Sequence, residues 1–216
     1  MRYPDHDTYA TLYARYFKRP VADLFHGIDL KGKRLLDLCG GGGRLSTYAA
    51  SMGAKVVYLE AETRMVPHFP KDMGIWVVNQ TVEEALPNAI GFGQSWDVVA
   101  CQQAVNYWLT ATTARMVSKV IDTDGLFVFN TFNNMPSVPV VKQYHLADTG
   151  LDYVEVSQLV DGMVHHVQCA TGMVPHTTVF RWITREEYLG LLTPYFACEE
   201  RVDGPTSIWV CRKREN

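Results

Sequence analysis

The sequence lacks a strong excess of either charge. Its 216 residues carry 20 Lys and Arg against 23 Asp and Glu, which gives a formal net charge of −3. No basic run is longer than Arg212-Lys213-Arg214. Because proteins that bind nucleic acid usually display a basic domain or stripe, we expect no nucleic-acid partner.

The cysteine patterns of a disulfide framework or a zinc site are also missing. The chain has five cysteines, an odd number, and no Cys-x-x-Cys pair. We therefore expect no metal site, and we expect each thiol to pack as a small hydrophobic group in a reducing compartment. The five are Cys39, Cys101, Cys169, Cys198 and Cys211.

Long apolar runs are absent as well. No stretch reaches the roughly 18 residues that a membrane span needs, and the polar segment from Met1 to His6 does not resemble a signal peptide. These absences predict no membrane association and a cytoplasmic location. The length favours one domain over residues 1–216, with an insertion.

Alternating patterns fill the first 130 residues. Residues 7–25 have helical spacing, and residues 44–52 and 110–121 read as further helices. Short apolar runs of strand length separate such patterns. Strands that alternate with helices predict a Rossmann-like α/β fold, with a doubly wound, mostly parallel sheet. The runs are 34–38, 55–59, 76–79, 97–101 and 126–129.

The pattern changes after residue 130. Extended segments at 151–160, 163–170 and 174–183 are separated by Asp161-Gly162 and Thr171-Gly172, which are hairpin turn signals. A capping box at residues 184–187 predicts a helix, and two strands at 196–202 and 207–211 follow it. We expect an antiparallel C-terminal strand and an antiparallel insertion. The predicted parts are an N-terminal helical cover (7–30), an α/β core (33–130), the insertion (131–183) and a C-terminal part (184–216).

Four consecutive glycines, residues 40–43, lie between a predicted strand and a predicted helix. Glycines there permit a tight turn and a close approach of ligand to backbone, and the helix supplies free N–H groups. The loop could hold a carboxylate or a phosphate. The dinucleotide motif Gly-x-Gly-x-x-Gly does not fit, because Leu45 or Ser46 takes its last position, and the Lys-Ser/Thr ending of a P-loop is absent.

An acidic residue, Glu60, ends the next predicted strand, 17 positions after Gly43. Acidic residues near this position meet ribose hydroxyls in nucleoside-binding α/β folds. The alternative is that Glu60 is an ordinary solvated residue at the end of a strand, because a second acidic residue, Glu62, follows closely.

Together these motifs resemble the class I S-adenosylmethionine-dependent methyltransferases. The family's first motif matches "LLDLCGGGGRLS", the second matches "VVYLEAETRMV", the third "VVNQTVEEALP" and the fourth "WDVVACQQAVNYW". Thr81 stands where many members have Asp, so the backbone of Val82 is an alternative adenine contact. The resemblance implies S-adenosylmethionine as cofactor and S-adenosylhomocysteine as product. It assigns the cofactor site to Asp37, Gly41, Gly43, Glu60, Ala61, Thr81, Val82 and Gln102.

The chain ends extend this resemblance. The N-terminal helix is similar to one that covers the methionine end of the cofactor, so a hydroxyl from Tyr9, Tyr13 or Tyr16 is expected at the cofactor carboxylate, with Tyr13 or Tyr16 favoured. "HTTVFRWITREEYLGLL" and "GPTSIWV" resemble the C-terminal half of amino-sugar N-methyltransferases and of glycine N-methyltransferase relatives. In those proteins an antiparallel insertion roofs the substrate site. The resemblance therefore implies that residues 33–130 form the cofactor-binding core and that the insertion is a roof over the active site.

Methyl transfer from a sulfonium is an in-line displacement that depends mainly on proximity and orientation, with a base where the acceptor arrives protonated. Strand alternation lets only one of His165 and His166 point inward. The candidate catalytic or acceptor-binding residues are Asn106, Tyr107, His166, His176 and Arg181. The competing interpretations are a helix cap and core aromatics for the first two residues, surface histidines for the next two, and a solvated side chain for the arginine.

The leading hypothesis is methyl transfer to N or O of a small-molecule acceptor. Another user of the cofactor, such as an aminopropyltransferase, and a catalytically silent binding or regulatory subunit are the alternatives. A basic open groove would favour an RNA or protein methyltransferase instead. We expect a small-molecule partner, and a homodimer is compatible with the sequence.

Overall fold

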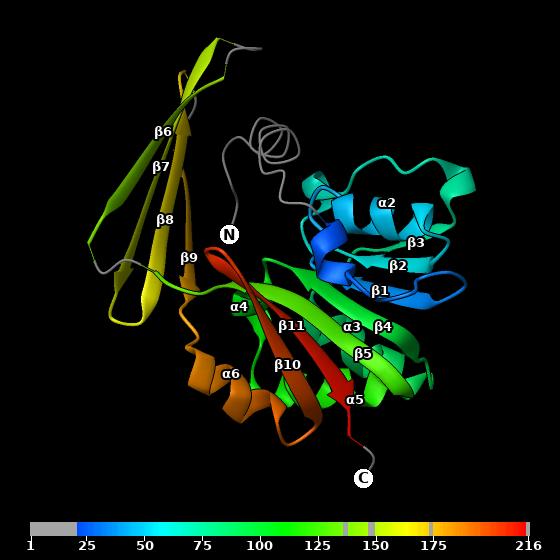
Figure 1. Ribbon diagram of the computed structural model, residues 1–216. Helices are drawn as coiled ribbons and strands as arrows, with labels where there is room; N and C mark the ends of the chain where they lie inside the picture. Colours follow the sequence, from blue (N-terminus) through cyan, green and yellow to red (C-terminus); the bar gives the residue numbers. More distant parts are fainter. Residues whose placement is uncertain (1–20, 136–137, 147–149, 173–174, 215–216) are drawn as a thin grey trace.

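The computed structural model describes residues 21–135, 138–146, 150–172 and 175–214, and it contains two separate β-sheets (Figure 1). The helix expected over residues 7–25 lies mostly outside the described residues, and so do Tyr9, Tyr13 and Tyr16. Its last part is a short 3-10 helix, η1 (Ala22–Phe25).

The larger sheet has seven strands in the order β10-β11-β5-β4-β1-β2-β3. The five strands from β3 to β5 run parallel, and β11 is antiparallel to both of its neighbours. This arrangement confirms the predicted mostly parallel α/β sheet with an antiparallel C-terminal strand. The strands are β1 (Arg34–Leu38), β2 (Lys55–Leu59), β3 (Ile75–Val78), β4 (Trp96–Gln102), β5 (Ile121–Phe132), β10 (Phe196–Asp203) and β11 (Thr206–Lys213).

Helices cover both faces of this sheet. Three of them begin at a threonine that closes a capping box, which fixes where each helix starts. None of the described helices is long and apolar enough to cross a membrane. The helices are α2 (Arg44–Ser51), α3 (Val82–Gly91), α4 (Val105–Trp108), α5 (Ala111–Val120) and α6 (Arg185–Leu192), with short 3-10 turns at η2 (Thr63–Met65) and η3 (Lys71–Met73).

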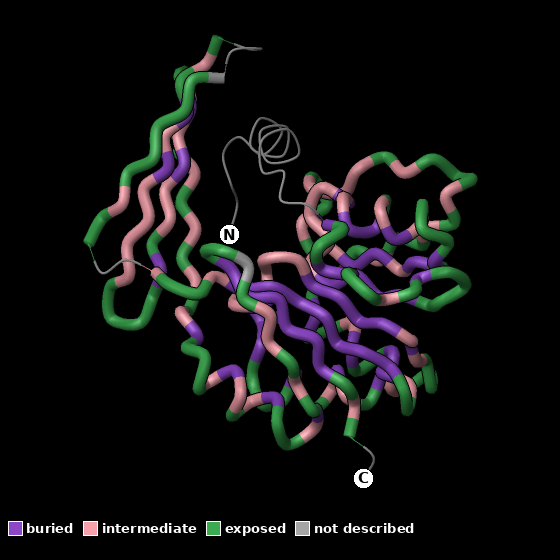
Figure 2. The backbone as a smooth tube through the Cα atoms, in the orientation of Figure 1, coloured by how far each residue is buried: buried purple, intermediate pink, exposed green. Residues whose placement is uncertain are grey.

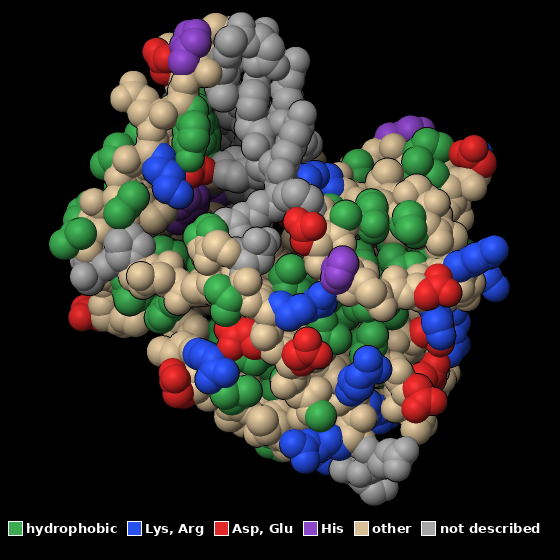
Figure 3. Space-filling model, in the orientation of Figure 1, with side chains coloured by type: hydrophobic (Ala, Val, Ile, Leu, Met, Phe, Trp, Pro, Cys, Tyr) green, Lys and Arg blue, Asp and Glu red, His purple; other side chains and the backbone are tan. Residues whose placement is uncertain are grey.

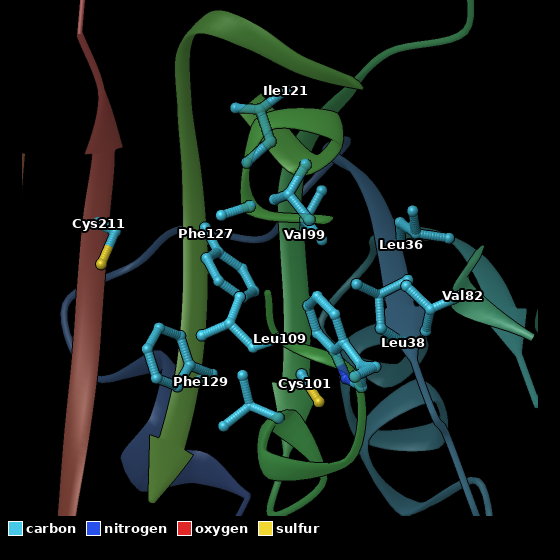
Figure 4. Close-up of a cluster of buried hydrophobic side chains, with 14 of the residues drawn as sticks. Leu36, Leu38, Val82, Val99, Cys101, Leu109, Ile121, Phe127, Phe129 and Cys211 are labelled. Carbon is cyan, nitrogen blue, oxygen red and sulfur yellow. The ribbon is translucent and has the colours of Figure 1, made fainter. Parts of the chain in front are cut away.

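The core has one layer on each face because successive residues of a strand point to opposite sides. In β1, Leu36 and Leu38 belong to the layer shared with α3 and α5, which Figure 4 shows around Phe127. Leu35 belongs to the layer shared with η1 and α2. The central strands are buried along most of their length (Figure 2). This packing holds the carboxyl ends of β1, β2 and β4 at one edge.

The smaller sheet is antiparallel, with the order β6-β7-β8-β9. It stands beside the larger sheet, with β9 next to α4 (Figure 1). Asp161 and Gly162 both have positive φ, 48° and 76°, as a two-residue hairpin turn requires. The first strand was not predicted, because polar residues interrupt its apolar pattern. The strands are β6 (Val140–Leu146), β7 (Leu151–Val160), β8 (Met163–Ala170) and β9 (His176–Arg181).

One expectation about the cysteines is wrong. Cys198 on β10 and Cys211 on β11 are cross-strand partners and form a disulfide. The sequence spacing did not reveal the pair, because strand register brings the two residues together. The other three cysteines, Cys39, Cys101 and Cys169, lie outside this disulfide.

Candidate active site

The candidate site lies where the carboxyl ends of β1, β2 and β4 meet. Open α/β sheets bind ligands beyond this edge. The glycine loop follows β1, Glu60 follows β2, and Gln102 ends β4. The structure therefore brings these three predicted elements to one edge of the sheet.

Glu60 is fixed by backbone N–H groups from two segments. Its Oε2 accepts from the Gly41 N–H at 2.9 Å, and its Oε1 accepts from the Glu62 N–H at 2.9 Å. Asn79, at the end of β3, donates to the carbonyl oxygens of Glu60 and Ala61 at 2.6 and 3.2 Å. Each carboxylate oxygen keeps lone-pair capacity for a ligand hydroxyl. Sequence reasoning missed Asn79, although a polar residue directly after an apolar strand was a usable signal.

Asp37 is a buried carboxyl group beside this loop. It is 1% exposed, and its Oδ2 accepts from the Ser46 hydroxyl at 2.6 Å. Burial raises its pKa from 3.8 to about 7; the charge of Glu60 adds to this rise, and the Ser46 hydrogen bond opposes it. Its Oδ1 has no hydrogen-bond partner within the part of the chain that the structure describes. A buried acceptor without a partner indicates a place for a ligand donor or a bound water.

The glycine loop is packed closely by aromatic side chains. A Cβ on Gly40 would lie 2.3 Å from the Tyr58 ring, and one on Gly43 would lie 2.6 Å from Pro67 and Phe69. The Tyr58 hydroxyl donates to the Gly41 carbonyl oxygen at 2.6 Å. A larger residue at Gly40 or Gly43 would therefore push these neighbouring rings out of place.

The loop is poorly suited to a phosphate, which the sequence left open. The Gly41 N–H is already bonded to the Glu60 carboxylate, and Asp37 lies close enough to Glu60 for their charges to interact. Two acidic side chains beside the loop disfavour a dianion and favour a neutral or cationic ligand with hydroxyl donors.

Thr81 and Val82 begin α3 at the next position along the edge. The Thr81 side chain accepts from the Glu84 N–H and donates to the Glu84 carboxylate, so its hydroxyl serves as the helix cap. The Val82 side chain is 3% exposed and packs in the core. A cofactor contact by either residue stays a prediction, and the capping role of Thr81 favours the Val82 backbone.

Two non-glycine residues at this edge have left-handed backbones. Cys39 follows β1 with φ 56°, and Gln103 follows β4 with φ 59°. The Gln103 N–H donates to Asn130 Oδ1 at 2.9 Å, which ties the β4 end to β5. A hydrogen bond to Cys101, together with burial, raises the pKa of the Cys39 thiol well above its ordinary value. Left-handed non-glycine residues cost free energy and often occur at functional sites.

Asn106 joins three elements. Its Nδ2 donates to the Arg181 carbonyl oxygen at 3.2 Å, and its Oδ1 accepts from the Tyr188 hydroxyl at 2.8 Å. It therefore links α4 to β9 and α6. The side chain of Arg181 pairs with Glu187 on α6. Tyr188 was not identified from the sequence, because its role depends on contacts far apart in the chain.

Tyr107 brings α4 against the roof, a name we use for the sheet β6–β9. Its ring centroid lies 5.1 Å from that of Phe180 on β9. We call the sheet face that carries Phe180 the inner face. The register places His166 and His176 on this face, and His165 and Arg181 on the other face.

His166 is held on the inner face by Ser157. Its Nδ1 lies 2.7 Å from the Ser157 hydroxyl oxygen. Burial is the main cause of the lowered pKa of His166; the nearby Lys142 also lowers it, and Glu155 raises it. The imidazole is therefore neutral at pH 7 and able to accept a proton.

Among the described residues, acidic and basic side chains are mixed over the molecular face in Figure 3 and form no continuous basic band there.

No protein-family model matches the chain. The chain is similar to the ubiquinone biosynthesis O-methyltransferase of Cereibacter sphaeroides, with 31% identity over 139 residues, 61% of this chain and 52% of that protein. The chain thus spans about half the length of the curated relatives that it matches.

Solved structures match almost the whole chain. The CcbJ methyltransferase from Streptomyces caelestis has a TM-score of 0.74 at 17% identity, and the match covers 98% of this chain and 100% of the CcbJ chain. CalS10 from Micromonospora echinaspora is an amino pentose methyltransferase solved with bound S-adenosylmethionine. It has a TM-score of 0.63 at 15% identity, and the match covers 97% of this chain and 92% of the CalS10 chain. These likenesses show that the chain has the Rossmann-like methyltransferase fold, as its motifs predicted.

Proposed function

We propose that the chain is an S-adenosylmethionine-dependent methyltransferase that methylates N or O of a small-molecule acceptor. The observation that carries the proposal is the Glu60 carboxylate, held by two backbone N–H groups beside the glycine loop. The methyltransferase names of the similar proteins support it. They also favour methyl transfer over aminopropyl transfer.

The residues present fit this cofactor. Glu60 has acceptor capacity for ribose hydroxyls, and the unpartnered Oδ1 of Asp37 can accept a further donor. In this proposal Ala61 and Val82 flank the adenosine, Gly41 holds Glu60 through its N–H, and the packing at Gly43 leaves no room for a larger side chain in the loop. When bound, the cofactor supplies a methyl group already activated on a sulfonium.

The protein then needs mainly to position the acceptor and exclude water. In this proposal Tyr107 and Phe180 form one wall of the acceptor site. The neutral His166 is the candidate proton acceptor for an acceptor that arrives protonated. Asn106 acts as a positioning residue, because both of its polar atoms bond to other parts of the protein.

Two measurements test the proposal. Titration calorimetry with S-adenosylhomocysteine is expected to give one site per chain, and labelled S-adenosylmethionine is expected to label compounds in a metabolite extract. Folded protein that binds no S-adenosylhomocysteine at millimolar concentration would refute it. Cofactor binding without any methyl transfer would favour a catalytically silent subunit. The proposal includes a cytosolic location, with the Cys198–Cys211 disulfide as an exception to the reduced thiols that are usual there. Light scattering distinguishes a monomer from a homodimer.

A further inference from the structure

Two cysteines meet beside the glycine loop, and the proposed reaction uses neither of them. Cys39 directly follows β1, and Cys101 lies near the end of the neighbouring strand β4. These strands pair in parallel, with Asp37 opposite Ala100. One step further along this register, Leu38 lies beside Cys101, and Cys39 comes next in the chain. Strand pairing therefore brings two thiols to the edge that carries the proposed cofactor site.

The backbone of Cys39 turns its side chain toward Cys101. If β1 continued as a regular strand, Cys39 would share the face of Leu35, because alternate residues point to the same side. Its φ of 56° breaks this alternation. Cys39 instead packs against the layer that contains Leu38 and Cys101, where Figure 4 shows the Cys101 sulfur. As a result, the two thiol groups are hydrogen-bonded to each other.

The residue type at position 39 costs free energy that a glycine would avoid. A left-handed backbone is disfavoured by roughly 1–2 kcal/mol for residues other than glycine. Cys39 adopts it although four glycines follow directly, so the chain places a thiol at a position that suits the residue type next to it. Strained non-glycine residues often mark functional sites. The chemistry that two adjacent thiols share is a reversible disulfide.

The geometry of the two strands suits such a bond. Neighbouring strands lie about 4.7–4.9 Å apart, and disulfides join Cα atoms that are about 4.4–6.8 Å apart. Cys39 is partly exposed, whereas Cys101 is buried. A small oxidant therefore reaches Cys39 first, and Cys101 is placed to react with the product.

We propose that Cys39 and Cys101 form an oxidation site, in which a disulfide between them draws the glycine loop toward β4 and weakens cofactor binding. The bond itself does not depend on the proposed function, but its effect on the cofactor rests on that function.

Hydrogen peroxide is an oxidant small enough for this site. The Cys39 sulfur attacks one peroxide oxygen, the O–O bond breaks, and the departing hydroxide takes up the thiol proton as water. The Cys101 sulfur then attacks the sulfenic acid on Cys39, so the S–O bond breaks and the S–S bond forms. The hydroxyl group leaves with the Cys101 proton as a second water. The two thiols lose two electrons in total, and the peroxide gains them.

Closing the bond must move the glycine loop. Two hydrogen-bonded sulfur atoms are further apart than the roughly 2.05 Å of a disulfide, so Cys39 is drawn toward Cys101. Gly40 follows directly and has little space to adjust, because Tyr58 packs against it. The next residue, Gly41, donates its N–H to the Glu60 carboxylate. The displacement therefore reaches the group that is proposed to hold the cofactor ribose.

Oxidation should be slow at neutral pH. The hydrogen bond to Cys101, burial, and the charges of Cys101, Glu60 and Asp37 all raise the pKa of the Cys39 thiol. Because the thiolate is the attacking form, the rate of disulfide formation should rise about tenfold from pH 7 to pH 8. The site therefore responds to sustained rather than brief exposure to peroxide.

Peptide mapping detects the bond without any ligand. Protein treated with excess hydrogen peroxide at pH 8 is alkylated in denaturant and digested with trypsin without reduction. We expect the peptide of residues 35–44 to be joined to that of residues 72–115, and the number of titratable thiols to fall from three to one. Dithiothreitol should separate the two peptides again. Unjoined peptides that keep both thiols, or that carry sulfinic acid instead, would overturn the proposal.

Calorimetry with S-adenosylhomocysteine measures the consequence. We expect oxidised wild type to bind it about tenfold more weakly, as for the loss of one hydrogen bond to a charged group. Cys39→Gly, which suits the left-handed backbone, and Cys101→Ala cannot form the bond, so peroxide should leave the affinity of each variant unchanged. Cys169→Ala, on the face of the roof opposite the inner face, is the matched control and should respond like the wild type.

The remaining outcomes are distinct. A joined peptide with unchanged affinity would overturn the effect on the cofactor. So would a loss of affinity that persists in Cys39→Gly and Cys101→Ala, because other oxidised residues would then cause it. Either variant suffices if the other does not fold. Failure of the proposed function appears separately, as untreated protein that binds no S-adenosylhomocysteine, and the peptide map tests the disulfide in that case too.

Discussion

Replacing Glu60 with Gln tests the cofactor site most directly. The carboxylate receives the Gly41 and Glu62 N–H groups on different oxygens, each at 2.9 Å. A glutamine oxygen can replace only one of these acceptors, and its NH₂ group would face the other N–H. The variant also loses one charged acceptor for the ribose. Hydrogen bonds to charged groups contribute about 1.5–3 kcal/mol each.

We therefore expect binding of S-adenosylhomocysteine to weaken by about 2–3 kcal/mol, which is a rise in Kd of roughly 30- to 150-fold. Titration calorimetry at pH 7.5 measures this directly. Glu83→Gln, in the exposed first turn of α3, is the matched control and should bind like the wild type. A Kd within twofold of wild type in folded Glu60→Gln would refute the assignment of Glu60 to the cofactor.

Three other changes give predictions from the same contacts. The pKa of Asp37 is raised to about 7 in the folded protein, against 3.8 for the ordinary group, so the folded state binds a proton that the unfolded state has lost, and the free energy of unfolding falls as pH rises between these values. Urea unfolding at pH 5 and pH 8 measures this fall, which Asp37→Asn should reduce. An equal fall in the wild type and in Asp37→Asn would show that the reasoning is wrong. Reducing the Cys198–Cys211 disulfide, whose cysteines are 13 residues apart, should lower the free energy of unfolding by about 2–3 kcal/mol. The unreduced protein should titrate three thiols once it is unfolded in denaturant, and five thiols under those conditions would exclude the bridge. Asn106→Ala should cost about 1–3 kcal/mol of stability and lower kcat/KM while S-adenosylhomocysteine affinity is kept; unchanged turnover would rule out its positioning role.

The edge of the sheet that carries the proposed cofactor site was predictable because its signals are local. The glycine loop and Glu60 each lie directly after an apolar strand, and a parallel sheet gathers such positions at one edge. The capping box at Thr184 likewise marked the start of α6 from four adjacent residues. In each of these cases the signal lies within a short segment of adjacent residues.

The remaining contacts depend on register and on packing between distant segments. Tyr188 reaches Asn106 across 82 positions, and Ser157 meets His166 only because β7 and β8 pair in one register. The same holds for the disulfide between β10 and β11. Residue types alone do not identify such partners. Strand alternation did reveal that His165 and His166 must face opposite ways.

The strand order also constrains how the chain is made. The roof strands pair with their neighbours in sequence, so this sheet can assemble as soon as its hairpins leave the ribosome. The free edge of β5 stays unpaired for longer, because its partner β11 is synthesised only after the whole roof. Phe129 of β5, for example, pairs with Trp209 of β11. During that interval an apolar strand edge is exposed to neighbouring chains. Slow or stalled translation between residues 146 and 206 should therefore increase aggregation of the nascent protein, and a chaperone that shields β5 should reduce it.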